Sequence, residues 1–210
     1  MIVIVDYGRG NLFSLSQALN MLEKSYIVTD DPLKIISASR LILPGVGAFG
    51  DAMISLRERK IIDPLHEAVN KGIPLLGICV GCQLLLEKSE EFGSHSGLSF
   101  IPGKVIKLPS LQMNSQSKVR VPNVGWRSLA IRPNVPILKY LNSNDWMYFV
   151  HSYAPSLHCS KHIAATTHIN GVDIPAAIYS ENILGVQFHP EKSGPSGLKL
   201  IDKFLSKEFI

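Results

Sequence analysis

A cysteine and a histidine that lie far apart in this chain have the surroundings expected of catalytic residues. Cys79 ends a short apolar run, and a second apolar run ends at His189, with Glu191 two positions further on. A thiol becomes a nucleophile when a base takes its proton, and the base works better when a third group orients it. These residue types therefore predict a cysteine nucleophile, a histidine base and a carboxylate that holds the imidazole ring.

The neighbours of Cys79 favour a nucleophile over a structural cysteine. Gly77 and Gly81 flank it, and a nucleophile on a sharp strand-to-helix turn needs small neighbours because the backbone is crowded there. On such a turn the N–H of Val80 points at a developing oxyanion, and the start of the following helix favours the thiolate. A free cysteine is most often a buried core residue, and the flanking glycines are the argument against that role here.

A second chemistry involves the same sulfur atom. Cys79 and Cys82 form a C-x-x-C pair at the expected start of a helix, as in thioredoxin-like redox proteins. This interpretation explains neither His189 nor the glycines, so we keep it as the alternative from a different functional class. A metal site is not expected, because the chain has no second Cys/His pair with ligand spacing.

His189 and Glu191 are expected to lie on the same side of an extended segment. Side chains two residues apart in a strand point in the same direction, and Pro190 between them restricts the backbone. The carboxylate would then hold the imidazole while the ring takes and returns a proton.

Elements of two kinds must position these residues. The first half alternates strand-like and helix-like segments, which predicts parallel βαβ units whose functional groups gather at the carboxyl ends of the strands. Cys79 and the glycine-containing turn at 44–47 would lie there, and the turn would offer backbone N–H groups to an oxyanion. We expect strands at 2–5, 26–29, 40–43 and 73–78, and helices from Asn11, from Asp63 and over 80–88.

The second half is different, because prolines separate short strand-like runs from about Phe100 onward. This pattern predicts antiparallel strands laid over one side of the sheet. The strands are expected at 147–150, 162–167, 176–179 and 184–188, with a final helix from about Ser196 and a mobile loop at 112–117.

Composition limits the remaining classes. The chain is 46% hydrophobic and 18% charged, with a net charge of +4 that forms no basic stripe interleaved with aromatic residues. Nucleic-acid binding is therefore not expected, and no apolar run approaches the roughly 20 residues of a membrane helix. The N-terminus lacks the basic region of a signal peptide, and the odd number of cysteines fits a reducing compartment, so a cytoplasmic location is expected.

Together these motifs resemble the class I glutamine amidotransferases, and within them the histidine-pathway glutaminase subunits and their close paralogues. The resemblance runs nearly end to end: the cysteine and His-Pro-Glu motifs are typical of the superfamily, and residues 6–11, Gly125-Trp126 and residues 192–194 are typical of the subfamily. It implies one flavodoxin-like α/β domain over residues 1–210, with a central, mostly parallel sheet and additional antiparallel strands in the C-terminal half.

The resemblance also implies a mechanism. Cys79 would attack the side-chain amide of glutamine, with His189 and Glu191 as the other members of the triad, and the ammonia would pass to a (β/α)8 cyclase subunit in a heterodimer. No metal or organic cofactor is implied. The oxyanion would be held by the backbone of Val80, Gly45, Val46 and Gly47, glutamine by Gln83, Glu91, His151, Ser152 and Tyr153, and the partner by Asn11, Trp126 and Lys192.

The chain departs from the family pattern near the active site and in one other segment. Val80 and Cys82 stand where the family has Leu and Met, whereas Asn123 and Arg127 replace a His and an Asn in a segment that faces the partner in the family. Residues 90–93 and 97–104 also look like paralogues that supply ammonia for amidination of a nucleotide-linked sugar in surface-polysaccharide synthesis. This acceptor is the alternative within the same class, and a cysteine hydrolase acting on other amides is a further one.

Overall fold

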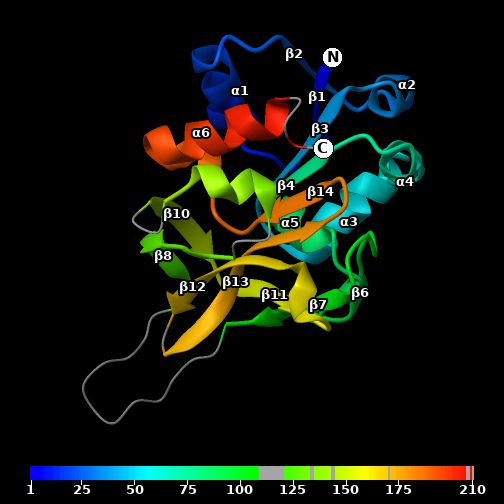
Figure 1. The fold of residues 1–210 in the computed structure, drawn as a ribbon. Helices are drawn as coiled ribbons and strands as arrows, with labels where there is room; N and C mark the ends of the chain where they lie inside the picture. Colours follow the sequence, from blue (N-terminus) through cyan, green and yellow to red (C-terminus); the bar gives the residue numbers. More distant parts are fainter. Residues whose placement is uncertain (109–120, 133–134, 143–144, 170, 207–208, 210) are drawn as a thin grey trace.

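The structure is a computed structural model that describes residues 1–108, 121–132, 135–142, 145–169, 171–206 and 209. The expected mobile loop at 112–117 lies outside the described residues. Figure 1 shows a central sheet with helices on both sides and further strands below it.

The central sheet joins the two halves of the chain. The strand order is β2-β1-β3-β4-β14-β13-β12-β9, and the pairs from β2 to β14 are parallel. The pairs from β14 to β9 are antiparallel, so the expected mostly parallel sheet with antiparallel additions is confirmed. The strands are β1 (Ile2–Val5), β2 (Tyr26–Thr29), β3 (Arg40–Gly45), β4 (Leu75–Cys79), β9 (Ala130–Ile131), β12 (Ile163–Ile169), β13 (Val172–Ser180) and β14 (Ile183–Val186).

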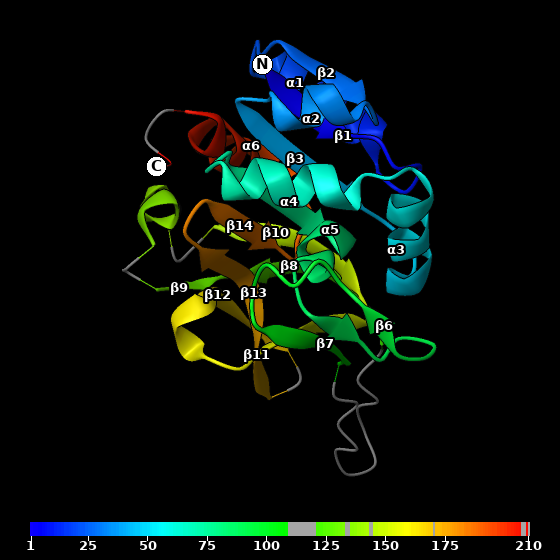
Figure 2. The ribbon, with the colours of Figure 1, turned by 90° about the vertical axis from the view of Figure 1, so that its right-hand side faces the viewer.

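Helices bury both faces of the parallel strands. All residues of β4 and β14 are buried, which is why these strands read as continuous apolar runs in the sequence. Two views at right angles place α1 and α6 on one face and α2 and α4 on the other (Figures 1 and 2). The helices are α1 (Leu12–Met21), α2 (Pro32–Ile36), α3 (Phe49–Glu58), α4 (Ile62–Asn70), α5 (Val80–Leu84) and α6 (Gly194–Leu205).

Two smaller sheets accompany the central sheet. One pairs β8 (Asn123–Ser128) with β10 (Trp146–His151), and the other has the order β11-β7-β5-β6. Along β8 and β10 buried and exposed residues alternate, so each strand has one face toward the core and one toward solvent. The second of these sheets consists of β5 (Lys88–Ser89), β6 (His95–Ser96), β7 (Gly103–Lys107) and β11 (Tyr153–Leu157), and short 3-10 helices are η1 (Pro136–Tyr140), η2 (Ser160–His162) and η3 (Pro190–Lys192).

Several expected boundaries are wrong. The helix expected over 80–88 ends at Leu84, because the chain leaves the helix to join the small sheet, where Glu87 N–H donates to Gly103 O. The expectation also missed α2 and α3, although α2 has a readable start: the Asp31 side chain accepts the N–H of Leu33, and Pro32 occupies the first turn.

Gly81 in the first turn of α5 sets the distance between this helix and β3. A Cβ atom built on Gly81 would overlap the carbonyl oxygen of Leu43. Because the opposing atom is backbone, it cannot move aside as a flexible side chain does.

We therefore expect Gly81→Ala to lower the free energy of unfolding by about 1–3 kcal/mol through overpacking. Glu58→Ala, on the exposed end of α3, is the matched control and should change it by less than about 0.5 kcal/mol. Urea denaturation of both variants measures this, and equal stability of the two would contradict the close contact.

Candidate active site

Cys79 occupies a strained turn between β4 and α5. Its φ is +56°, a left-handed conformation that is rare for a residue with a side chain and is typical of a nucleophile on a strand-to-helix turn. The flanking glycines are required by packing, since a Cβ on Gly77 would lie 2.7 Å from Gly81 O. The interpretation of residues 77–81 as a nucleophile turn is consistent with this geometry.

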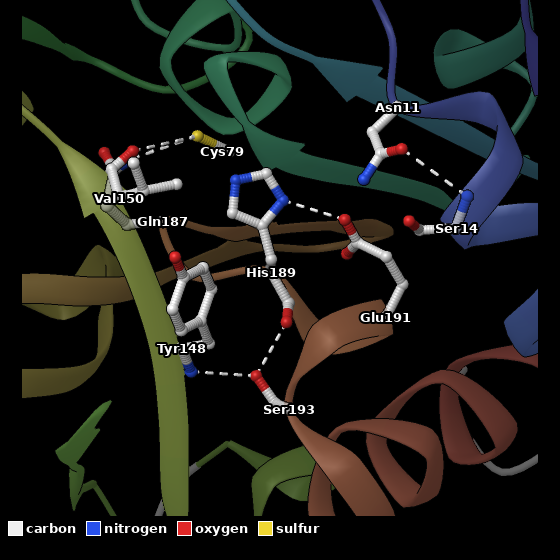
Figure 3. A network of polar contacts seen from close by, with 9 residues as sticks. All are labelled: Asn11, Ser14, Cys79, Tyr148, Val150, Gln187, His189, Glu191 and Ser193. Atoms are coloured by element: carbon white, nitrogen blue, oxygen red, sulfur yellow. Dashed lines mark hydrogen bonds and ion pairs between the residues drawn. The ribbon is translucent and has the colours of Figure 1, made fainter. Parts of the chain in front are cut away.

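His189 lies between Cys79 and Glu191 (Figure 3). The Nδ1 atom of His189 is 2.8 Å from Oε1 of Glu191, and both side chains are almost fully buried, with exposures of 3% and 2%. The two side chains do not meet through an extended segment, as the sequence had suggested. Residues Pro190–Lys192 form a 3-10 turn, which folds the carboxylate back toward the ring.

Ser193 fixes the backbone of His189 against β10. Its Oγ donates to His189 O at 2.6 Å and accepts the N–H of Tyr148 at 2.9 Å, while His189 N–H donates to Tyr148 O at 2.9 Å. Figure 3 shows the two hydrogen bonds of Ser193 directly below the imidazole ring. The sequence interpretation did not assign a role to Ser193, because only the tertiary structure brings β10 beside it.

The surroundings of His189 favour its charged form. Burial lowers the pKa, but hydrogen bonds to Cys79 and Glu191 and the negative charges of both groups outweigh burial and raise the pKa of His189 to about 10. The ring is thus an imidazolium beside the sulfur at neutral pH, able to give a proton to a leaving group. Among the described residues, Oε2 of Glu191 is the buried side-chain oxygen or nitrogen without a hydrogen-bond partner.

A cavity of about 280 Å³ opens in front of Cys79. This volume is at the small end for ligand sites and suits a substrate the size of an amino acid. The cavity brings together the triad cysteine and histidine with residues expected to hold glutamine or the oxyanion. Its lining is Val46, Gly47, Cys79, Val80, Gln83, Glu91, Val150, His151, Ser152, Tyr153 and His189.

Of the backbone N–H groups expected to bind the oxyanion, that of Val80 is available in this conformation and that of Val46 is not. Val80 opens α5, where the first-turn N–H groups have no partner within the helix, so its N–H can serve an oxyanion. The N–H of Val46, by contrast, donates to Arg9 O at 2.8 Å and is therefore directed away from a substrate. Gly47, with φ +88°, supplies the conformational freedom beside it.

Two of the residues expected to hold glutamine, Glu91 and Gln83, already form side-chain hydrogen bonds to other groups of the protein. Oε2 of Glu91 accepts the N–H of Phe49 at 2.7 Å, which caps the start of α3. The Nε2 atom of Gln83 donates to Tyr153 O and to Oε1 of Gln187, both at 2.9 Å. Both residues line the cavity, but the side-chain N–H groups of Gln83 are already engaged.

Asn123 and Arg127 do not lie on the solvent face of β8. Asn123 is 3% exposed, its Oδ1 accepts from Nε and Nη2 of Arg127, and its Nδ2 is 3.1 Å from Nε2 of His151. The Nδ1 atom of His151 is 2.9 Å from Tyr153 O, which only accepts, so this nitrogen carries the proton. Asn123 is thus buried and Arg127 half-buried, and both belong to a chain of contacts that ends at His151 in the cavity wall.

The second cysteine of the C-x-x-C pair faces a different part of the core. Cys82 is fully buried, and burial raises the pKa of its thiol well above the usual value. Its sulfur lies 2.8 Å from the position of a Cβ built on Gly185, whereas the sulfur of Cys79 is near Val150 O and Gln187. All three cysteines are free, and this geometry does not support a dithiol switch.

Two of the three residues expected at a partner interface are exposed. Trp126 and Lys192 are exposed, and Asn11 caps α1 by accepting the N–H of Ser14 at 3.4 Å. The outer face of β8 and β10 carries the apolar side chains of Val124, Trp126, Tyr148 and Val150.

Within the described residues, no group of three or more His, Cys, Asp or Glu side chains is placed to hold a metal ion, and no helix is long and apolar enough to cross a membrane.

The two buried histidines predict opposite pH dependences of stability. Burial, together with the charges of His189 and Arg127, lowers the pKa of His151 to about 4, although the bond to Tyr153 O opposes this. An unfolded His151 protonates near 6.5, so the free energy of unfolding falls as pH drops from 6.5 to about 4. The contribution of His189 is present below 6.5 and is lost as pH rises toward about 10.

Side-chain ¹⁵N NMR of the histidines tests these assignments. We expect His151 to keep its neutral Nδ1–H form down to about pH 5 and His189 to keep both ring protons above about pH 8. In Glu191→Gln the His189 midpoint should move down. A His151 midpoint near 6.5 would contradict the hydrogen-bond chain through Asn123.

Comparisons with known proteins identify the family of this chain. The family model described as glutamine amidotransferase class-I matches residues 3–207. The chain is 44% identical to imidazole glycerol phosphate synthase subunit HisH of Geobacillus sp. (strain WCH70), over 98% of this chain and 96% of that protein. It is 42% identical to the HisH subunit of Syntrophotalea carbinolica, over 97% of this chain and 98% of that protein.

Solved structures share the fold at lower identity. The structure of PurLQS from Thermotoga maritima aligns with a TM-score of 0.70 at 21% identity, covering 97% of this chain and 96% of that chain. A structure described as a glutamine amidotransferase aligns with a TM-score of 0.71 at 19% identity, covering 98% and 97%. From the family match over nearly its whole length and from these relatives, the chain belongs to the class I glutamine amidotransferases.

Proposed function

We propose that this chain is the glutaminase subunit of an imidazole glycerol phosphate synthase, acting through Cys79, His189 and Glu191 in one domain over residues 1–210. The observation that carries the proposal is the buried His189, held by Glu191 and facing Cys79 at the wall of an amino-acid-sized cavity. The nearly full-length similarity to HisH subunits supports the histidine pathway over sugar amidination.

The reaction follows from the arrangement of the site. The Cys79 thiolate attacks the side-chain amide carbon of glutamine, and the resulting oxyanion is stabilised by the Val80 N–H. Protonated His189 gives its proton to the nitrogen, which leaves as ammonia while the thioester forms. Neutral His189 then takes a proton from water, the hydroxide attacks the thioester, and glutamate leaves with release of the thiolate and the imidazolium.

A second oxyanion donor requires a change at the end of β3. In the structure the Val46 N–H is held by Arg9 O, so we propose that the peptide at 46–47 turns over in the active state. The positive φ of Gly47 makes such a change sterically accessible. The free chain would then be a poor glutaminase until a partner favours the turned conformation.

We propose that the partner is a (β/α)8 cyclase subunit that binds over the mouth of the site. Ammonia protonates in water at neutral pH, so a covered path into a second active site preserves its reactivity. The exposed apolar face of β8 and β10 is the surface for this contact. On it the rings of Trp126 and Tyr148 meet edge to face, with their centroids 6.0 Å apart. Lys192 and Asn11 are the other residues that we expect to contact the partner. A cytoplasmic location fits an enzyme whose Cys79 must remain a free thiol.

The activity predicts a specific pattern of ammonia release. We expect the pure chain to release little ammonia from glutamine alone, and at least about 100-fold more with a histidine-pathway cyclase and its nucleotide ligand. Cys79→Ala should abolish release under all conditions, whereas Cys82→Ser should retain it. Release that depends on Cys79 but ignores this cyclase would move the chain to another acceptor, such as a nucleotide-linked sugar.

The partner surface predicts a separate effect on binding. Trp126→Ala removes the largest exposed aromatic side chain of β8, so we expect the cyclase to bind at least about 10-fold more weakly, as for a central aromatic contact. Phe92→Ala, another exposed aromatic change, is the control. Calorimetry of both variants with the cyclase measures this, and equal affinities would argue against the β8–β10 surface.

A further inference from the structure

Gln187 follows β14 directly, and its side chain reaches the sulfur of Cys79. Gln187 is fully buried, and its Nε2 atom is 3.8 Å from Sγ of Cys79, a hydrogen-bond distance for sulfur (Figure 3). The sequence alone gave Gln187 no role. In the parallel pairing of β14 with β4, Val186 is opposite Ile78, so the next residues along the chain, Gln187 and Cys79, lie at the same level at the carboxyl edge of the sheet.

The chemistry of its neighbours fixes the orientation of the Gln187 amide. Nε2 of Gln83 is 2.9 Å from Tyr153 O, and a backbone carbonyl can only accept, so the group that faces it is the Gln83 NH₂. The second N–H of this NH₂ donates to Oε1 of Gln187 at 2.9 Å. The carbonyl of Gln187 is therefore used, and its NH₂ is the end turned toward the sulfur.

An N–H donor in this position stabilises the thiolate form of Cys79 more than the neutral thiol or thioester. An N–H bond to an anionic acceptor is about twice as strong as one to a neutral acceptor, and more so where water is excluded. The thiolate is the anionic state, whereas the thiol and the thioester are neutral. Val150 O, at 4.0 Å on the same side of the cavity, accepts the S–H proton of the thiol.

We propose that Gln187 is a catalytic residue whose side-chain N–H stabilises the thiolate of Cys79, and that Gln83 is a positioning residue that holds the Gln187 amide in the required orientation. The role of Gln83 is then structural in part, because both of its N–H groups are used within the protein rather than on glutamine. The inference rests on the proposed role of Cys79 as the nucleophile.

The rate at which iodoacetamide alkylates Cys79, measured across pH by mass spectrometry of the whole chain, tests the inference. The background variant is Cys159→Ser, because Cys159 is exposed and would react, whereas Cys82 is fully buried. In Gln187→Met, which has a similar length and no N–H, we expect alkylation at neutral pH to be about 5- to 10-fold slower. The rate at strongly alkaline pH, where the thiolate forms in any case, should be unchanged.

Gln83→Met keeps the Gln187 amide but releases its orientation, so we expect a smaller loss at neutral pH, about 2- to 3-fold. The matched control is Asn182→Leu, which removes an amide bonded to Val69 O and Ile73 O away from the cavity. Asn182→Leu should lower stability without moving the pH profile. In the cyclase complex, Gln187→Met should lower kcat and leave KM for glutamine unchanged.

An unchanged pH profile in both Gln187→Met and Gln83→Met would overturn the inference, as would an equal loss of rate at every pH, which indicates altered access to Cys79. These outcomes are separate from the test of the triad. If Cys79→Ala retained glutaminase activity, the nucleophile assignment would fail, but the alkylation profile would still report whether Gln187 acts on the sulfur.

Discussion

The close packing of α5 against the end of β3 is the constraint on which the active site depends. Because Gly81 allows the helix backbone to lie on the carbonyl of Leu43, the chain must turn sharply at Cys79, which adopts φ +56°. The strain is tolerated because β4 is buried and paired on both sides, with β3 and with β14. The same turn brings both Cys79 and Val80, the first residue of α5, to the cavity, so the positions of the proposed nucleophile and the proposed oxyanion donor depend on one contact.

The parallel arrangement of β4 and β14 determines which residues meet the sulfur. Parallel neighbours end at the same edge, so the segment after β14 brings Gln187 and then His189 to Cys79. Ser193 and the backbone of Tyr148 lock His189 in place from the side of the smaller sheet. Apart from Oε2 of Glu191, the buried polar groups of this cluster are thereby paired with one another, and such pairing is needed because an unpaired polar group in the core is costly.

Asn123 and Arg127, two departures from the family pattern, form hydrogen bonds with each other, and Asn123 also forms one with His151. Arg127 offers only donors and Tyr153 O only accepts, so Asn123 and His151 between them have a single consistent arrangement. This chain keeps His151 neutral next to the charged His189. No strand was expected from the sequence at β8, so the inward orientation of Asn123 is visible only in the structure, since one residue of register decides whether a side chain points inward.

The sequence by itself determined the class of fold and pointed to the residues that we propose perform the chemistry. Cys79 between glycines, the His189 and Glu191 pair and the alternation of apolar runs are local patterns, and local patterns are visible in a linear chain. Only the tertiary structure decided the turn that joins His189 to Glu191, the bond that holds the Val46 N–H away from the cavity, and the contact of Gln187 with the sulfur. Each of these depends on which segments lie side by side, and contacts between distant segments are set by packing of the whole core rather than by neighbouring residues.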